Sequence, residues 1–236
     1  MRFSQPLISG LLLKRYKRFL ADIELDTGEV VTAHCANPGA MLGLVATGSR
    51  VWLSKSDSAT RKLAHSWEIA RADFGWGSRL VGVNTARANA IATEAVEAGF
   101  FTEFEGYAPP RREVKYGVSS RVDLLLESDG KPPCYVEIKS VTLTRRAELA
   151  EFPDSVTTRG AKHLVELGDM VERGARAVML YVIQMEAERF ALAADIDRKY
   201  AEAFALAKKR GVEAIAVVCD VGLEEIVVAR RVEMAG

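Results

Sequence analysis

Cysteine and histidine are both scarce in this chain of 236 residues, which contains only three of each. Cys35, Cys134 and Cys219 lie far apart and are odd in number, so the sequence predicts neither a disulfide framework nor a CxxC metal site. The histidines are equally scattered and lack the spacing of zinc ligands. A chain whose few cysteines show no disulfide pattern suits a reducing compartment, and we expect a cytoplasmic protein.

Long apolar runs are also missing. No stretch approaches the roughly 18 apolar residues that a membrane-spanning helix needs. The first residues, MRFSQPLISGLLLKRYKRF, contain a short apolar patch that Gly10 interrupts and no small-residue cleavage site, so we do not expect a signal peptide. With 49% hydrophobic and 27% charged residues, the composition is that of a globular protein with one large domain or two small ones.

The net charge of the whole chain is zero, but its charged residues are unevenly distributed. Residues 1–82 hold 11 Lys/Arg and 7 Asp/Glu, a net charge of +4, whereas the remainder holds 21 basic and 25 acidic residues, a net charge of −4. A basic first part joined to an acidic second part is consistent with a polyanionic partner for the first part. The alternative is that the surface charge is uneven without serving to bind any partner, which is equally consistent with the net charges of the two parts.

The first 82 residues show the pattern of an all-β domain. Short β-like runs such as LISGLLLKRY and FLADIEL are separated by Gly/Ser/Asp turn signals, among them DTGE at 26–29. NPGAMLGL at 37–44 reads as a tight loop between strands. Five or six short strands in this length predict a small closed barrel, and an OB-like nucleic-acid-binding barrel over 1–82 is the natural candidate.

Residues 83–236 alternate between helical and strand patterns. The predicted order α-β-β-β-α-β-α-β forms a mixed sheet flanked by helices, so the whole chain is a two-domain protein that combines the α+β and α/β classes. We expect helices over 86–99, 160–174 and 200–211, and strands over 111–117, 121–127, 134–143, 176–184 and 212–221.

Three charged residues occur where neighbouring strands of this sheet should present them together. Asp123 lies on one strand, and Glu137 and Lys139 share a face of the next because side chains alternate with period two. Two adjacent carboxylates repel unless a cation lies between them, and Mg²⁺ or Mn²⁺ prefers such oxygen ligands. We therefore predict that Asp123 and Glu137 bind the metal and that Lys139 stabilises charge on a phosphate. A surface salt-bridge cluster is the alternative.

This Asp…Glu-x-Lys pattern on consecutive strands resembles the active-site pattern of the PD-(D/E)xK nuclease-like fold. Several members of that fold take a further acid from the preceding helix, and Glu94 falls on the same predicted side of that helix as Ile91 and Ala95. The resemblance therefore implies four catalytic residues in this chain, Asp123, Glu137, Lys139 and Glu94.

A basic and aromatic segment, KRYKRF, occupies residues 14–19. Phosphates attract basic groups and bases stack on aromatic rings, so this segment suits a nucleic-acid surface. The expected contacts are Lys14, Arg15, Tyr16, Lys17 and Arg18. A solvated strand face with core-facing aromatics fits the same pattern.

Lys162 and His163 lie near the start of the helix predicted at 160–174, where an anion is favourably placed. We count both as candidate phosphate contacts. Lys162 can instead pair with Glu166 at i,i+4. Gln184, at the end of a buried strand, could orient a water molecule or bind a base.

Longer motifs make the chain similar to the bacterial and archaeal sugar fermentation stimulation protein family. The similar segments include GLLLKRYKRFLADIELDTGE, AHCANPGAM, SRVDLLLE, CYVEIKSVTL and AEFPDSVTTRGAKHL. The resemblance covers almost the whole chain. It implies an N-terminal OB-like domain, a C-terminal nuclease-like domain, DNA binding and a regulatory link to genes of sugar (maltose) metabolism. Asp123 follows Arg121-Val122, where the fold's motif has proline, a residue often absent in this fold.

Two functions follow from these patterns. The first is a divalent-metal-dependent deoxyribonuclease, and the second is a non-catalytic DNA-binding transcriptional regulator on a nuclease scaffold. Because no helix-turn-helix pattern occurs, we expect DNA to be bound with little sequence specificity. A module that binds only another protein would have no use for the acidic site. We expect no membrane association, and a homodimer is compatible with the sequence.

Overall fold

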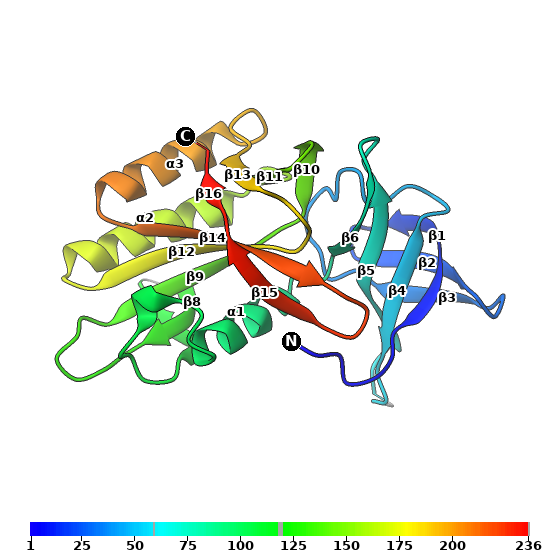
Figure 1. Cartoon of the computed structure of the whole chain (residues 1–236), viewed down its shortest axis with the longest axis horizontal. Coiled ribbons are helices and arrows are strands. Elements are labelled where there is room, and N and C mark those ends of the chain that lie inside the picture. The colour runs from blue at the N-terminus through cyan, green and yellow to red at the C-terminus, as the bar shows by residue number, and fades with distance from the viewer. Residues whose placement is uncertain (59, 118–119, 236) are drawn as a thin grey trace.

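The N-terminal part of the computed structural model is a closed β-barrel; the structure describes residues 1–58, 60–117 and 120–235. The barrel strands run in the order β3-β2-β1-β4-β5-β6, and an additional parallel pairing of β3 with β5 closes β1–β5 into a ring (Figure 1). The predicted OB-like barrel is confirmed. Its strands are β1 (Ile8–Tyr16), β2 (Leu20–Leu25), β3 (Val30–His34), β4 (Arg50–Lys55), β5 (His65–Asp73) and β6 (Ser78–Gly82).

The alternation of apolar and polar residues explains these strands. In β2, LADIEL, the side chains of Ala21, Ile23 and Leu25 are buried while those between them are more exposed. The turn predicted at DTGE joins β2 to β3, and Gly28 adopts the positive φ of 84° that favours glycine in such a turn. The loop expected at 37–44 follows β3 and contacts the second domain, where Met41 N donates to Asp154.

The C-terminal part is built on a six-stranded mixed sheet in the order β15-β14-β12-β9-β8-β7. Pairing is parallel between β9, β12 and β14 and antiparallel elsewhere. The predicted α-β-β-β-α-β-α-β order is present, and β15, which was not predicted, adds an edge strand to the sheet. Its elements are α1 (Arg87–Glu97), β7 (Arg111–Tyr116), β8 (Ser120–Leu126), β9 (Cys134–Val141), α2 (Thr158–Glu172), β12 (Arg176–Ile183), α3 (Arg198–Lys209), β14 (Glu213–Val221) and β15 (Ile226–Arg231), with a short 3₁₀ turn at Thr102–Phe104.

A small second sheet was not expected from the sequence. It has the order β10-β11-β13-β16 and consists of β10 (Leu143–Arg146), β11 (Leu149–Phe152), β13 (Arg189–Leu192) and β16 (Glu233–Met234). Strands of two to four residues are too short to show a periodic pattern, which is why they escaped prediction.

Helices cover both faces of the large sheet (Figure 1). On β12 the alternate residues Val178, Leu180 and Val182 pack with α1, whereas Met179 and Tyr181 pack with α2 and α3. This two-sided burial explains why β12 is apolar along nearly its whole length.

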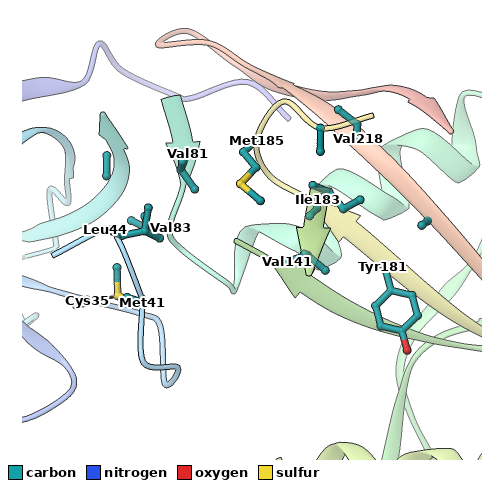
Figure 2. Packing of buried hydrophobic residues seen from close by; sticks show 14 of the residues in the cluster. Cys35, Met41, Leu44, Val81, Val83, Val141, Tyr181, Ile183, Met185 and Val218 are labelled. Carbon is teal, nitrogen blue, oxygen red and sulfur yellow. Dashed lines mark hydrogen bonds between the residues drawn. The ribbon is translucent and has the colours of Figure 1, made fainter. Parts of the chain in front are cut away.

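The barrel and the second domain share one hydrophobic cluster. Figure 2 shows Cys35, Met41 and Leu44 of the barrel side in the same cluster as Val141 and Ile183 of the large sheet. The two parts therefore pack as one body. Among the described residues, no helix has the length and apolarity required to cross a membrane.

Candidate functional site

Antiparallel pairing of β8 with β9 brings the predicted carboxylates together. Leu124 is paired with Val136, so Asp123 and Glu137 are next in register. At this point the strands are linked by a side chain, because Ile138 N donates to Asp123 Oδ2 at 2.7 Å. The two acids therefore lie side by side at the end of the β8–β9 ladder, as the sequence pattern predicts.

Glu137 uses only one of its carboxylate oxygens. Its Oε1 accepts from Lys139 Nζ at 2.8 Å and lies in close contact with His163 Nδ1. Its Oε2 is buried and has no hydrogen-bond partner in the described part of the chain. Burial alone would raise the pKa of Glu137, but the hydrogen bond from His163 and the charge of Lys139 hold it below its usual value. Glu137 is therefore an anion with one oxygen available.

His163 is placed differently from the expectation of a phosphate contact. It is buried on α2, where Nδ1 meets Glu137 and Nε2 accepts from Arg159 Nε at 3.3 Å. Because Nε2 is an acceptor here, the contacts favour the tautomer that carries its proton on Nδ1 and donates it to Glu137. His163 thus supports the acidic site instead of facing solvent.

Asp123 is held from the other side of the sheet by a residue that the sequence reasoning missed. Asn89 Nδ2, in the first turn of α1, donates to Asp123 Oδ1 at 2.8 Å. Burial, together with the charge of Glu137, raises the pKa of Asp123 to about 6, even though the hydrogen bonds from Ile138 and Asn89 oppose this shift. An apolar-flanked carboxyl beside a second anion is a natural place for a cation.

The structure does not bring Glu94 to this site. Its side chain is 56% exposed and lies 2.6 Å from the amino group of Met1. Glu94 comes five positions after Asn89, which is about 7.5 Å along a helix axis, so Glu94 lies farther along α1 than the residue that reaches Asp123.

A cleft of about 780 Å³ opens beside Lys139 and separates the two domains. The second domain lines it with Asn89, Lys139 and Ser140, and the barrel with Arg15 and Arg18. Gln184 Nε2 donates to Ser140 Oγ at 2.7 Å. Because Ser140 accepts this hydrogen bond, its own hydroxyl proton is free to point elsewhere in the cleft.

The basic hairpin between β1 and β2 divides into two kinds of residue. Arg15 is structural, since its guanidinium donates to the carbonyl groups of Asn37 and Gly39 at 2.9 Å and thereby holds the loop after β3. Lys17 and Arg18 form the turn, with positive φ values of 46° and 64°, and their side chains are exposed.

Lys14, Tyr16 and Lys162 are each tied to a neighbouring acid. Lys14 Nζ lies 3.4 Å from Asp22, to which Tyr16 also donates. Lys162 lies 3.5 Å from Glu166, the i,i+4 pair that was the alternative reading, and half of its side chain is exposed. Of the predicted nucleic-acid contacts, only Arg15 and Arg18 line the cleft itself.

A divalent cation fits between Asp123 and Glu137 by its chemistry, although the donor set is small. A cation at this point would give Glu137 Oε2 a partner. Its charge would also favour the ionised form of Asp123, whose pKa is raised in the folded protein. Within the described ranges no three His, Cys, Asp or Glu residues form a group that could hold a metal ion. Any cation here would complete its coordination with water or substrate oxygens.

Known proteins share this architecture along the whole chain. The model of the sugar fermentation stimulation protein RE domain matches residues 86–225, and that of the SfsA N-terminal OB domain matches residues 13–83. A sugar fermentation stimulation protein homolog from Azorhizobium caulinodans is 52% identical over all of both chains, and one from Paramagnetospirillum magneticum is 54% identical over 93% of this chain and 91% of its own.

The same fold is found in a solved structure, that of Pyrococcus furiosus SfsA in complex with Ca²⁺. It matches with a TM-score of 0.88 and 24% identity, and the match covers 100% of this chain and 98% of the archaeal one. The two matching family models and the two relatives above 50% identity show that the chain belongs to the sugar fermentation stimulation protein family.

Proposed function

We propose that this protein binds DNA in the cleft between its domains and cleaves it with a divalent cation, Mg²⁺ or Mn²⁺, held by Asp123 and Glu137. The observation that carries the proposal is the asymmetry of Glu137. One oxygen is held by Lys139 and His163, and the other is buried beside a second carboxyl group without a partner among the residues that the structure describes. A buried acceptor left unpaired is costly in a purely structural cluster and useful in a ligand site.

The surrounding residues have distinct roles in this proposal. His163 contacts Glu137 and Asn89 donates to Asp123, so these two residues hold the acids in place, and Asn89 also lines the cleft. Lys139 lines the cleft beside Glu137, so its ammonium group can stabilise negative charge on a phosphodiester. A bound divalent cation would supply a Lewis acid and a more acidic water molecule.

Two further observations support a nucleic-acid substrate. Arg18 and Arg15 place positive charge on the barrel wall of the same cleft, where phosphates would be attracted. The archaeal relative with the same fold is described as a complex with Ca²⁺, an ion that also prefers oxygen ligands.

Cleavage of supercoiled plasmid tests the proposal. The wild-type protein and its Glu137→Gln variant are incubated with plasmid or single-stranded DNA in Mn²⁺, Mg²⁺ or EDTA. We expect cleavage by the wild type that EDTA abolishes, and at least a hundredfold slower cleavage by the variant, because a charged ligand is lost.

Glu127→Gln is the matched control. Glu127 follows β8 on the surface, where it pairs with Arg111. Because this exposed ion pair lies outside the proposed site, the Glu127→Gln variant should cleave DNA at the wild-type rate. Equal rates for the wild type and Glu137→Gln would identify a contaminant and refute the assignment.

A non-catalytic DNA-binding regulator is the second candidate. It is favoured by the small donor set, since the described residues offer two carboxylates and no third side-chain ligand grouped with them. In this case the basic hairpin alone would determine affinity, and binding would need no cation.

Salt dependence of binding tests this alternative. Each phosphate contact contributes about 0.9 to the slope of log K against log salt on duplex DNA. The substitutions Lys17→Ala and Arg18→Ala should together reduce this slope by about two. Arg15 is left unchanged because it holds the loop after β3. An unchanged slope would exclude the hairpin as the binding surface.

A further inference from the structure

One of the three tryptophans lies outside the core. Trp52 is 7% exposed and Trp67 is fully buried, whereas Trp76 is 40% exposed at the tip of the hairpin between β5 and β6 (Figure 1). Neither the fold nor the acidic site requires a large aromatic ring at this position.

The hairpin turn holds Trp76 in a defined position. Gly75 N donates to Asp73 Oδ1 at 2.9 Å, and Phe74 N donates to Gly77 O at 3.3 Å. Both glycines have positive φ values, 84° and 148°. Apart from chain neighbours, no described atom lies within 4 Å of the point where a Cβ would stand on either of them. The described part of the turn is therefore not crowded at the two glycines that flank Trp76.

One face of the indole is already covered by a stacked ring. The centroids of Phe74 and Trp76 lie 5.8 Å apart with an interplanar angle of 16°. Because Trp76 is 40% exposed despite this contact, it keeps ring surface on which another flat ring can stack. A stack of two aromatic side chains with exposed ring surface is a platform on which a nucleobase can be added.

The stack is joined to the barrel wall of the cleft. A Cβ on Gly43 would lie 3.1 Å from the Phe74 ring, so the ring rests on the loop that follows β3. Three residues earlier in this loop, Ala40 lines the cleft and its carbonyl group accepts from Arg15 at 3.4 Å. Three residues span at most about 10 Å. Met41 N donates to Asp154 of the second domain at 2.9 Å, which fixes the loop between the cleft and the stack.

We propose that Trp76 is a stacking site for one unpaired nucleobase, so that the nucleic acid in the cleft has a single-stranded or unpaired nucleotide at the barrel end. The proposal rests on the nucleic-acid binding proposed above. The chemistry needed is a ligand with a phosphate for Arg18 and a flat ring for Trp76. A base pair inside a duplex has both faces occupied by its neighbours and cannot supply that ring.

Tryptophan fluorescence tests the proposal directly, because Trp76 is the exposed one of the three. The full-length protein is titrated in EDTA with a short single-stranded oligonucleotide and, separately, with its duplex. We expect the single strand to quench the emission of the wild type and the duplex to quench it far less. Trp76→Phe should lose the quenching and retain a ring, so its affinity for the single strand should stay within about threefold.

Affinities of Trp76→Ala then separate the possible outcomes. Loss of one base–aromatic stack should weaken single-strand binding by about tenfold or more and leave duplex binding unchanged. Equal single-strand affinity in the wild type and Trp76→Ala, or an equal loss for both ligands, would overturn the stacking site alone. If the wild type binds no nucleic acid at all, the proposed function fails as well.

Discussion

Replacement of Asp123 by Asn should change how the stability of the protein depends on pH. The pKa of this carboxyl rises from 3.8 to about 6 on folding, mainly through burial and also through the charge of Glu137. Between these two values the folded state binds more protons than the unfolded state. The contribution of Asp123 to stability therefore falls as the pH rises from about 4 to about 6, and it stays low at higher pH.

The size of the effect follows from this shift in the Asp123 pKa. A change from 3.8 to about 6 corresponds to about 3 kcal/mol of cost for ionised Asp123 in the folded protein. An Asn side chain removes the charge, but its amide group cannot accept from both Ile138 N and Asn89 Nδ2, so about 1 kcal/mol of hydrogen bonding is lost. The variant should therefore be about 2 kcal/mol more stable than the wild type at pH 8 and no more stable at pH 4.

Urea denaturation in EDTA at several pH values from 4 to 8 measures this difference. Burial, together with the charge of Lys55, lowers the pKa of His65, so this group makes the protein more stable as the pH rises. His65 lies in the barrel and acts in the same way in both proteins, so its effect cancels in the difference. A difference between wild type and Asp123→Asn that does not change from pH 4 to pH 8 would refute the assignment.

Added Mn²⁺ extends the same experiment. A cation bound to the folded state should stabilise the wild type at pH 8 and much less at pH 5, where protons compete for Asp123. Asp123→Asn should show little stabilisation at either pH. Asn89→Ala, which removes one hydrogen bond that favours ionised Asp123, should shift the onset of the Mn²⁺ effect to higher pH. Equal stabilisation at pH 5 and pH 8 would count against a cation at this carboxyl.

Two further substitutions test contacts between the domains. Arg87→Ala would leave the fully buried carboxylate of Glu68 without its cation, and we expect a loss of about 3 kcal/mol in urea denaturation, whereas a loss below about 1 kcal/mol would mean that Asn84 suffices. Gly39→Ala would push a methyl group into the carboxylate of Asp154, so melting temperature and DNA affinity should both fall, and an unchanged protein would show that the loop can move.

The sequence pattern placed the acidic strands correctly but chose the wrong helix residue for contact with Asp123. Alternation on β8 and β9 determines which side chains share a face, and that rule needs no tertiary information. On α1, helical periodicity indicates a side of the helix but not a height along it. Glu94 lies on a plausible side, yet the first turn is the part that meets Asp123, and Asn89 occupies it.

The role of His163 was beyond reach of spacing rules for a different reason. Its partner Glu137 is 26 residues away, and the contact exists only because α2 packs on the large sheet. A signal was nevertheless present, since His163 lies four and seven residues before Leu167 and Met170, on the apolar stripe of α2. A polar ring on a buried stripe needs a polar partner. Glu137, an acid on a strand of the sheet that α2 covers, was the residue to consider as that partner.

Contacts between the domains explain why a cleft, and not a flat junction, forms beside Lys139. Glu68 on β5 accepts from Arg87 and Asn84 and thus fixes the start of α1, the turn that carries Asn89. Asp154 accepts from Met41 on the opposite wall. These two links, together with the shared hydrophobic cluster, set the distance between the basic hairpin and the acidic pair. A ligand that spans the cleft is therefore met by both domains at once. Weakening the link at Glu68, which does not line the cleft, should impair binding by changing how the two walls are held.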